Sequence, residues 1–198
     1  MVLQIFEADF FDFMNNYLVA LGSNLASGQL TSLEILQEAL VVMSNSKINV
    51  ISVSAWWQSN AFPPSARPNY INGVAKVSST LNPQEALQCL KEIEILFGRK
   101  RSKRWGNRVL DLDLLACGSM ILPNKLVFKE WLSLSLDLQK KREPTQLILP
   151  HPRIQDRLFV LKPLVEVFPD WVHPVLGKNP QELIDDTTWD SRDLLKLL

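Results

Sequence analysis

The sequence contains few cysteines, no excess of charge of either sign and no long apolar run. Its two cysteines, Cys89 and Cys117, are too few for a disulfide framework and lie in apolar contexts, so we expect reduced, buried thiols in a cytoplasmic protein. The 21 lysines and arginines balance 21 aspartates and glutamates, so net charge does not favour a nucleic-acid partner. No apolar run approaches the length of a membrane span, and residues 1–16 lack the basic start and unbroken apolar core of a secretory signal. We therefore expect neither a membrane nor a nucleic acid as partner.

What is present is the composition of an ordinary globular domain. The 198 residues, 46% hydrophobic and 21% charged, suffice for a single compact domain with a full core. Apparent strands and helices mix without strict alternation, which indicates an α+β fold in which helices flank an antiparallel sheet. Expected strands cover residues 17–21, 47–59, 70–78 and 109–115, and expected helices begin near Thr31, Asn82 and Phe159.

Three further segments carry specific expectations about local structure. Gly22-Ser23-Asn24 is expected to form a tight turn with glycine at positive φ. Residues 121–145 are expected to form a short helix followed by a surface loop, and Ser191–Leu198 to be helical.

The most informative stretch runs from Gly98 to Leu115. Val109–Leu115 is typical of a short buried strand, in which Asp111 and Asp113 share one face and the intervening leucines the other. A crowded group of cations precedes this strand: Arg99, Lys100, Arg101, Lys103, Arg104 and Arg108. Two neighbouring carboxylates repel each other unless a cation lies between them, and magnesium prefers carboxylate oxygens together with substrate phosphates. Because arginines are forked donors suited to phosphate, the stretch predicts a site for metal and polyphosphate.

Other interpretations of these residues remain open on chemistry alone. A basic run can be a solvated loop, and the aspartates can simply pair with nearby arginines. A nucleic-acid or nucleotide binding module could use the 99–108 loop, with Trp105 and Tyr70 as stacking platforms. Aspartate pairs also bind metal and nucleotide-sugar in glycosyltransferases, and a non-catalytic paralogue is a further alternative.

Four motifs together favour the first interpretation. The run Arg-x-Arg-x-x-Arg-Trp-Gly-x-Arg-x-Leu-Asp-Leu-Asp-Leu resembles the signature of the 6-hydroxymethyl-7,8-dihydropterin pyrophosphokinase family of folate biosynthesis. Residues 17–25 (YLVALGSNL), 68–72 (PNYIN) and 150–164 (PHPRIQDRLFVLKPL) resemble three other motifs of that family, in the family's order. The resemblance covers roughly residues 16 to 175 and implies a ferredoxin-like fold. It also implies transfer of diphosphate from ATP to the hydroxymethyl group of the dihydropterin, with release of AMP.

The resemblance also implies roles for individual residues. Asp111 and Asp113 would hold two Mg²⁺ ions, and ATP would be the co-substrate. Catalytic phosphate contacts would come from Arg99, Arg101 and Arg108. The residues expected at ATP are Glu94, Arg99, Arg101, Arg108, His151 and Arg157. The residues expected at the pterin are Tyr70, Asn72, Phe159, Trp105 and Ser59.

The same resemblance divides the chain and identifies departures from the family pattern. Residues 1–16 are expected to be an extension, 17–175 the pyrophosphokinase domain of a monomer, 122–145 an insertion and 176–198 a C-terminal tail. Asn107 stands where proline is usual, the 60–68 loop lacks glycine, and Arg67 stands where many relatives carry glutamine.

Overall fold

A six-stranded antiparallel sheet forms the centre of the molecule. The structure, a computed structural model, describes residues 14–60, 68–98, 108–187 and 194–196. The strands are β1 (Asn15–Ser23), β2 (Asn49–Val53), β3 (Trp57–Ser59), β4 (Tyr70–Ser79), β5 (Asp111–Cys117) and β6 (Leu194–Lys196). Their order is β5-β1-β4-β3-β6, and β2 pairs with a later part of β4 than β3 does. This arrangement confirms the expected α+β class.

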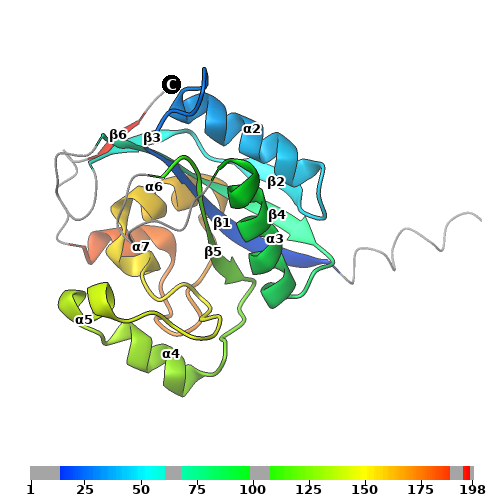
Figure 1. Ribbon diagram of the computed structural model, residues 1–198. Coiled ribbons are helices and arrows are strands. Elements are labelled where there is room, and N and C mark those ends of the chain that lie inside the picture. Colours follow the sequence, from blue (N-terminus) through cyan, green and yellow to red (C-terminus); the bar gives the residue numbers. More distant parts are fainter. Residues whose placement is uncertain (1–13, 61–67, 99–107, 188–193, 197–198) are drawn as a thin grey trace, which may run out of the picture.

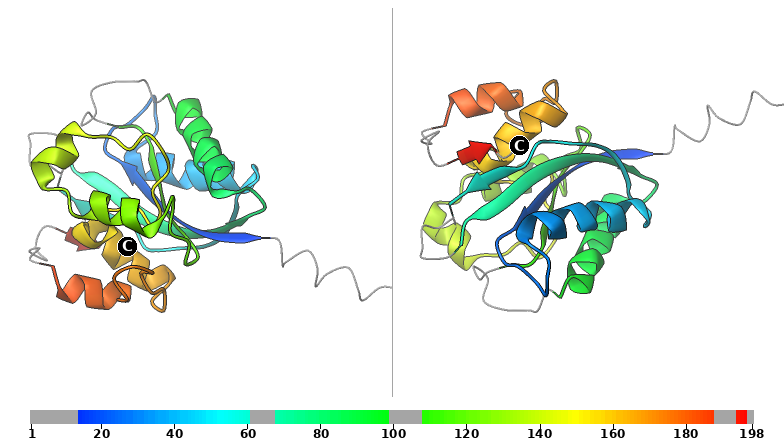
Figure 2. Two further views of the ribbon diagram at one scale, coloured as in Figure 1. Left: turned by 90° about the horizontal axis from the view of Figure 1, so that it is seen from below. Right: turned by 90° about the horizontal axis from the view of Figure 1, so that it is seen from above.

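Helices cover both faces of the sheet (Figures 1 and 2). On one face lie α2 (Ser32–Ser44) and α3 (Pro83–Leu96), and on the other α6 (Leu158–Val167) and α7 (Pro180–Asp185). Each face has its own apolar core, because successive strand residues point to opposite sides. Ala75 and Val77 of β4 pack in the core under α2 and α3, whereas Val74 packs in the core under α6. Within the described part of the chain, no helix is both long and apolar enough to span a membrane.

Helix starts follow the expected capping chemistry. Thr31 caps α2 and Asn82 caps α3, each through a reciprocal capping box with a glutamate three residues later. The remaining helices are α4 (Lys125–Leu132), α5 (Leu136–Lys141) and the 3-10 turn η1 (Ile154–Asp156).

Two expectations about the first half of the chain are wrong. Gly22 is not at positive φ in a turn but lies inside β1, which continues to Ser23. The single strand expected over 47–59 is divided into β2 and β3, because the Ser54 hydroxyl accepts the backbone N–H of Val74 at 3.0 Å and interrupts the ladder.

Two expectations about the second half are also wrong. The segment expected to be a loop before Thr145 contains α5, whose Gln-Lys-Lys sequence is polar but compatible with a helix. Residues 194–196 are not helical: they form β6 and pair with β3, since an open strand edge can override local propensity. In addition, Leu183 of α7 is buried against α6, so part of residues 176–198 packs into the core.

Candidate functional site

Three strands place an acid, a glycine and an amide in one row across the sheet. Asp111 of β5 is paired with Gly22 of β1, and Gly22 is paired with Asn72 of β4. A Cβ atom at Gly22 would lie 3.7 Å from Asn72 Oδ1 and 3.9 Å from both Asp111 Cβ and Tyr70 Cδ1. Gly22 therefore provides a floor without a side chain between the Asp111 carboxylate and the Asn72 amide.

The Asn72 amide is oriented by β3. Its Nδ2 donates to Ser59 Oγ at 2.9 Å and to the Trp57 carbonyl at 3.3 Å, and the side chain is 6% exposed. Because both donors are directed at β3, the Oδ1 acceptor is the amide atom that faces the Gly22 floor. Ser59 therefore orients Asn72, a connection that sequence reasoning did not identify.

Each aspartate of β5 is paired with an arginine. Arg108 is paired with Asp111, and Arg157 Nη1 lies 3.1 Å from Asp113 Oδ2. Burial raises the pKa of Asp113, but the positive charges of Arg157 and Arg108 outweigh this effect and hold that pKa below its ordinary value. Asp113 is therefore ionised at neutral pH.

The donor chemistry at this position fits magnesium. Asp111 and Asp113 project from the same face of β5, while Leu112 and Leu114 pack in the opposite core. In residues 14–60, 68–98, 108–187 and 194–196, no group of three or more His, Cys, Asp or Glu side chains could hold a metal. A pair of carboxylates suits magnesium, which retains waters and takes further ligands from substrate phosphates rather than from a complete protein cage.

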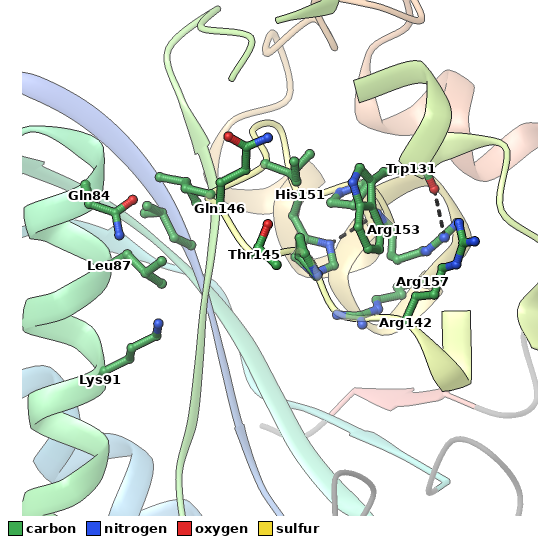
Figure 3. Close-up of a pocket in the computed structure, with 15 residues that line it drawn as sticks. Gln84, Leu87, Lys91, Trp131, Arg142, Thr145, Gln146, His151, Arg153 and Arg157 are labelled. Atoms are coloured by element: carbon green, nitrogen blue, oxygen red, sulfur yellow. Dashed lines mark hydrogen bonds between the residues drawn. The ribbon is translucent and has the colours of Figure 1, made fainter. Parts of the chain in front are cut away.

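A pocket of about 340 Å³ opens beside Asp113's partner Arg157 (Figure 3). Gln84, Leu87 and Lys91 project from α3 on one side, and His151, Arg153 and Arg157 gather on the other. Leu114, Trp131, Arg142, Pro144, Thr145, Gln146, Leu147, Ile148 and Pro152 complete its lining.

His151 is fixed in this wall through its main chain and its ring. Its backbone N–H donates to the Leu115 carbonyl at 2.7 Å, and its Nδ1 accepts the Arg153 backbone N–H at 3.2 Å. Burial, followed by the positive charge of Arg157, lowers the pKa of His151 to about 4. At neutral pH this histidine is uncharged.

The second histidine, His173, is a buried neutral group outside the pocket. Its Nδ1 accepts the backbone N–H groups of Val175 and Leu176, both at 3.2 Å, and burial lowers its pKa to about 4. The unfolded chain therefore binds more protons than the folded chain between about pH 6.5 and pH 4, so histidine-dependent stability is complete above pH 6.5 and declines as the pH falls through this window.

We expect this titration to be measurable by urea denaturation at pH 7 and pH 4.5. The His173 shift alone predicts a free energy of unfolding about 2 kcal/mol lower at pH 4.5. His173→Asn keeps an acceptor for the two backbone N–H groups, but its amide does not titrate. The loss of unfolding free energy between pH 7 and pH 4.5 should therefore be about 2 kcal/mol smaller in this variant than in wild type. An unchanged difference in the variant would show that His173 is not the responsible group.

Asn24 binds the residues that directly follow segments 61–67 and 99–107. Asn24 Oδ1 accepts the Arg108 backbone N–H at 2.8 Å, and the Asn24 backbone N–H donates to the Arg108 carbonyl at 3.1 Å. Asn24 Nδ2 donates to the Pro68 carbonyl at 3.2 Å. Asn24 of the Gly-Ser-Asn motif thus fixes the first residues after segments 61–67 and 99–107, instead of completing a turn.

The remaining predicted site residues differ in how much the structure says about them. Glu94 is 2% exposed, and its Oε1 accepts the Leu112 backbone N–H at 2.8 Å, so it holds α3 against β5. The Arg157 guanidinium carbon lies 5.9 Å from the centroid of the Phe159 ring on α6. Arg99, Arg101 and Trp105 lie outside the described residues. Sequence reasoning did not assign Lys91, Trp131 or Arg153 to a site, because only the fold brings them to the pocket.

Comparisons of the chain with a family model and with known proteins identify the same enzyme family. The family model for 7,8-dihydro-6-hydroxymethylpterin-pyrophosphokinase (HPPK) matches residues 18–169. A 2-amino-4-hydroxy-6-hydroxymethyldihydropteridine pyrophosphokinase of Synechocystis sp. is 38% identical over 169 residues, which are 85% of this chain and 74% of the relative. The Pseudomonas aeruginosa protein of the same name is 36% identical over 167 residues, which are 84% of this chain and 88% of the relative.

Solved structures show the same fold. A Plasmodium falciparum HPPK-DHPS crystal structure with pteroate matches with a TM-score of 0.61 at 13% identity, over 92% of this chain and 46% of that one. The fold therefore agrees with this solved structure, and the family model and both relatives carry the name of the same enzyme. The chain belongs to the 7,8-dihydro-6-hydroxymethylpterin-pyrophosphokinase family.

Proposed function

We propose that the row of Asp111, Gly22 and Asn72, together with the adjoining pocket, transfers diphosphate from ATP to the hydroxymethyl group of 6-hydroxymethyl-7,8-dihydropterin. Membership of the family makes the chain an ATP-dependent pyrophosphokinase of folate biosynthesis. The observation that supports this assignment is that the two aspartates lie between the Gly22 floor on one side and the pocket on the other.

Asp111 and Asp113 face different neighbours along one strand. Asp111 lies beside the Gly22 floor, next to Tyr70 and Asn72. Asp113, two residues further along β5, is paired with Arg157, which lines the pocket with His151. Residues two apart on a strand are separated by about 7 Å, a distance that magnesium and phosphate groups can span. We therefore assign the floor to the pterin and the pocket to the nucleotide.

The pterin surface combines an acceptor with aromatic rings. We propose that Asn72 Oδ1 accepts N–H groups at the polar edge of the pterin, because its Nδ2 already donates to Ser59 and Trp57. Loss of a buried hydrogen-bond partner costs about 1–3 kcal/mol, so this amide would contribute to specificity. Tyr70 and Phe159 are proposed to stack on the ring, and Trp105 to cover it.

The reaction requires positioning and charge neutralisation more than covalent help from the protein. A bond forms between the hydroxymethyl oxygen and the β-phosphorus as the bond to the oxygen bridging the α- and β-phosphorus atoms breaks. AMP leaves with the bridging oxygen, and the hydroxyl proton passes to water. Magnesium held by Asp111 and Asp113 would neutralise phosphate charge. Arg108 beside Asp111 and Arg157 beside Asp113 add positive charge near the phosphates, and neutral His151 lines the nucleotide pocket.

Several finer assignments remain predictions of the same proposal. Arg99 and Arg101 would bind phosphate, two Mg²⁺ ions would be present, and the enzyme would be a cytoplasmic monomer that binds no nucleic acid. Glu94 is included because its hydrogen bond to Leu112 fixes the residue between the two aspartates, and its direct contact with ATP is a prediction. The division into an extension (1–16), a catalytic domain (17–175) and a C-terminal segment (176–198) is also retained as a proposal.

Phosphorus NMR tests this function directly. We expect ATP mixed with the protein, magnesium and 6-hydroxymethyl-7,8-dihydropterin to give AMP and a pterin diphosphate in equal amounts. Omission of the pterin should leave ATP intact. If ATP persists in the complete mixture, or if ADP is the product, the proposed diphosphate transfer is wrong.

A further inference from the structure

The 122–145 segment is joined to the nucleotide pocket rather than projecting from the fold. Its ends are closed by a pair of backbone hydrogen bonds, from Leu122 N to Leu149 O at 2.8 Å and from Leu149 N to Leu122 O at 3.1 Å. Phe128 of α4 is fully buried, with its ring centroid 5.6 Å from that of His173. The segment is therefore fixed at its base and along one face of α4.

A buried arginine fixes the end of α4 that reaches the pocket. Arg153 is 9% exposed, and its Nη2 donates to the Trp131 carbonyl at 2.9 Å. This carbonyl belongs to the last turn of α4, where carbonyls lack partners within the helix and attract cations. Arg153 Nη1 also lies 3.4 Å from Asp156 Oδ2, so the guanidinium links α4 to η1. Trp131 is thereby held where it lines the pocket.

The pocket is lined by positive groups and by one indole. Arg157 beside Asp113 carries positive charge suited to phosphate, and Lys91 lines the opposite side (Figure 3). Among the described residues of the lining, Trp131 is the one tryptophan, tyrosine or phenylalanine. Its presence favours the nucleoside, because an indole ring can pack against a base or a ribose.

We propose that Trp131 is a specificity-determining residue that contacts the nucleoside moiety of ATP, and that Arg153 is the positioning residue that holds it there. This inference rests on the proposed function, and it assigns the 122–145 segment a role in the same site. It predicts that Trp131 contributes to recognition of the nucleoside and that its loss leaves recognition of the phosphates unchanged.

Calorimetric titration with two magnesium complexes separates these contributions. α,β-Methylene-ATP presents nucleoside and phosphates, and inorganic tripolyphosphate presents phosphates alone. For Trp131→Ala we expect the dissociation constant of the ATP analogue to rise about tenfold, a value typical of losing one stacking contact, with no change for tripolyphosphate. Leu126→Ala is the matched control, because Leu126 lies on the same helix, is 71% exposed and does not line the pocket.

A double-mutant cycle tests the positioning role of Arg153. Arg153→Met should weaken binding of the ATP analogue relative to tripolyphosphate in the wild-type background, but not in the Trp131→Ala background, because its effect acts through the indole. Arg153→Lys, which can still donate to the carbonyl, should recover much of the affinity. Equal effects of Arg153→Met in both backgrounds would overturn the positioning role.

The outcomes distinguish this inference from the proposed function. If the wild-type enzyme transfers diphosphate but Trp131→Ala binds the ATP analogue as tightly as wild type, the inference is wrong and the function stands. If the wild-type protein forms no pterin diphosphate yet shows the Trp131 dependence, the proposed reaction is wrong and the nucleoside contact stands.

Discussion

Replacing both Asp111 and Asp113 with asparagine is expected to lower the rate of diphosphate transfer by about a thousandfold or more, since charge stabilisation of this kind supplies several kcal/mol. Asparagine preserves the shape of each side chain but removes the two negative charges that could hold magnesium. The same change leaves Arg108 and Arg157 without their ionised partners. The rate of AMP formation at saturating magnesium, ATP and pterin measures the effect.

The control for this experiment is Asp170→Asn, an exposed carboxylate after α6, which should retain the wild-type rate. Each single variant should also require more magnesium than wild type for half-maximal rate. A double variant that keeps a tenth or more of the wild-type rate would exclude these aspartates as the metal site.

The second large effect is expected in stability, at Gly73 of β4. A Cβ atom there would lie 2.7 Å from Trp56 Cζ3 and 2.8 Å from Trp56 Cε3, well inside normal contact distance. Trp56 packs against the core under α2 and α3, so its ring cannot move without disturbing that packing. We expect Gly73→Ala to lower the free energy of unfolding by about 2 kcal/mol, as measured by urea denaturation.

Two comparisons identify steric conflict with Trp56 as the cause. Gly22→Ala, another strand glycine, introduces a Cβ no closer than 3.7 Å to its neighbours, so its stability should change little. In a Trp56→Leu background the additional cost of Gly73→Ala should largely disappear, because the smaller side chain removes the close contact. An equal cost in both backgrounds would contradict this explanation.

The features that were predictable from sequence are those determined by short-range rules. Alternation along a strand predicted that Asp111 and Asp113 share one face of the sheet, and the structure confirms this, with the intervening Leu112 in the core on the opposite face. The caps at Thr31 and Asn82 were predictable because each side chain binds backbone groups only two or three residues away. The family signature depends on side-chain identity and spacing, which are read directly from sequence.

The features that were not predictable depend on contacts between distant segments. Gly22 was expected in a turn, since glycine in a Gly-Ser-Asn run is typical of one. Its actual role follows from Asn72 and Asp111 on neighbouring strands. Residues 194–196 become a strand only because β3 offers an edge for pairing. Likewise, Arg153 reaches Trp131 across 22 residues, which no local pattern encodes.

The hydrogen bond between Glu94 and Leu112 has a further consequence for the behaviour of the protein in solution. β5 is the terminal strand of the sheet, and the sequence Leu112–Cys117 is almost wholly apolar. An exposed strand edge of this kind can recruit a strand from another molecule and begin aggregation. On this edge the Glu94 carboxylate accepts the Leu112 backbone N–H, and the His151 backbone N–H donates to the Leu115 carbonyl, so neither group is available to another strand. The strand that carries Asp111 and Asp113 is therefore protected against self-association by side-chain and main-chain groups from outside the sheet.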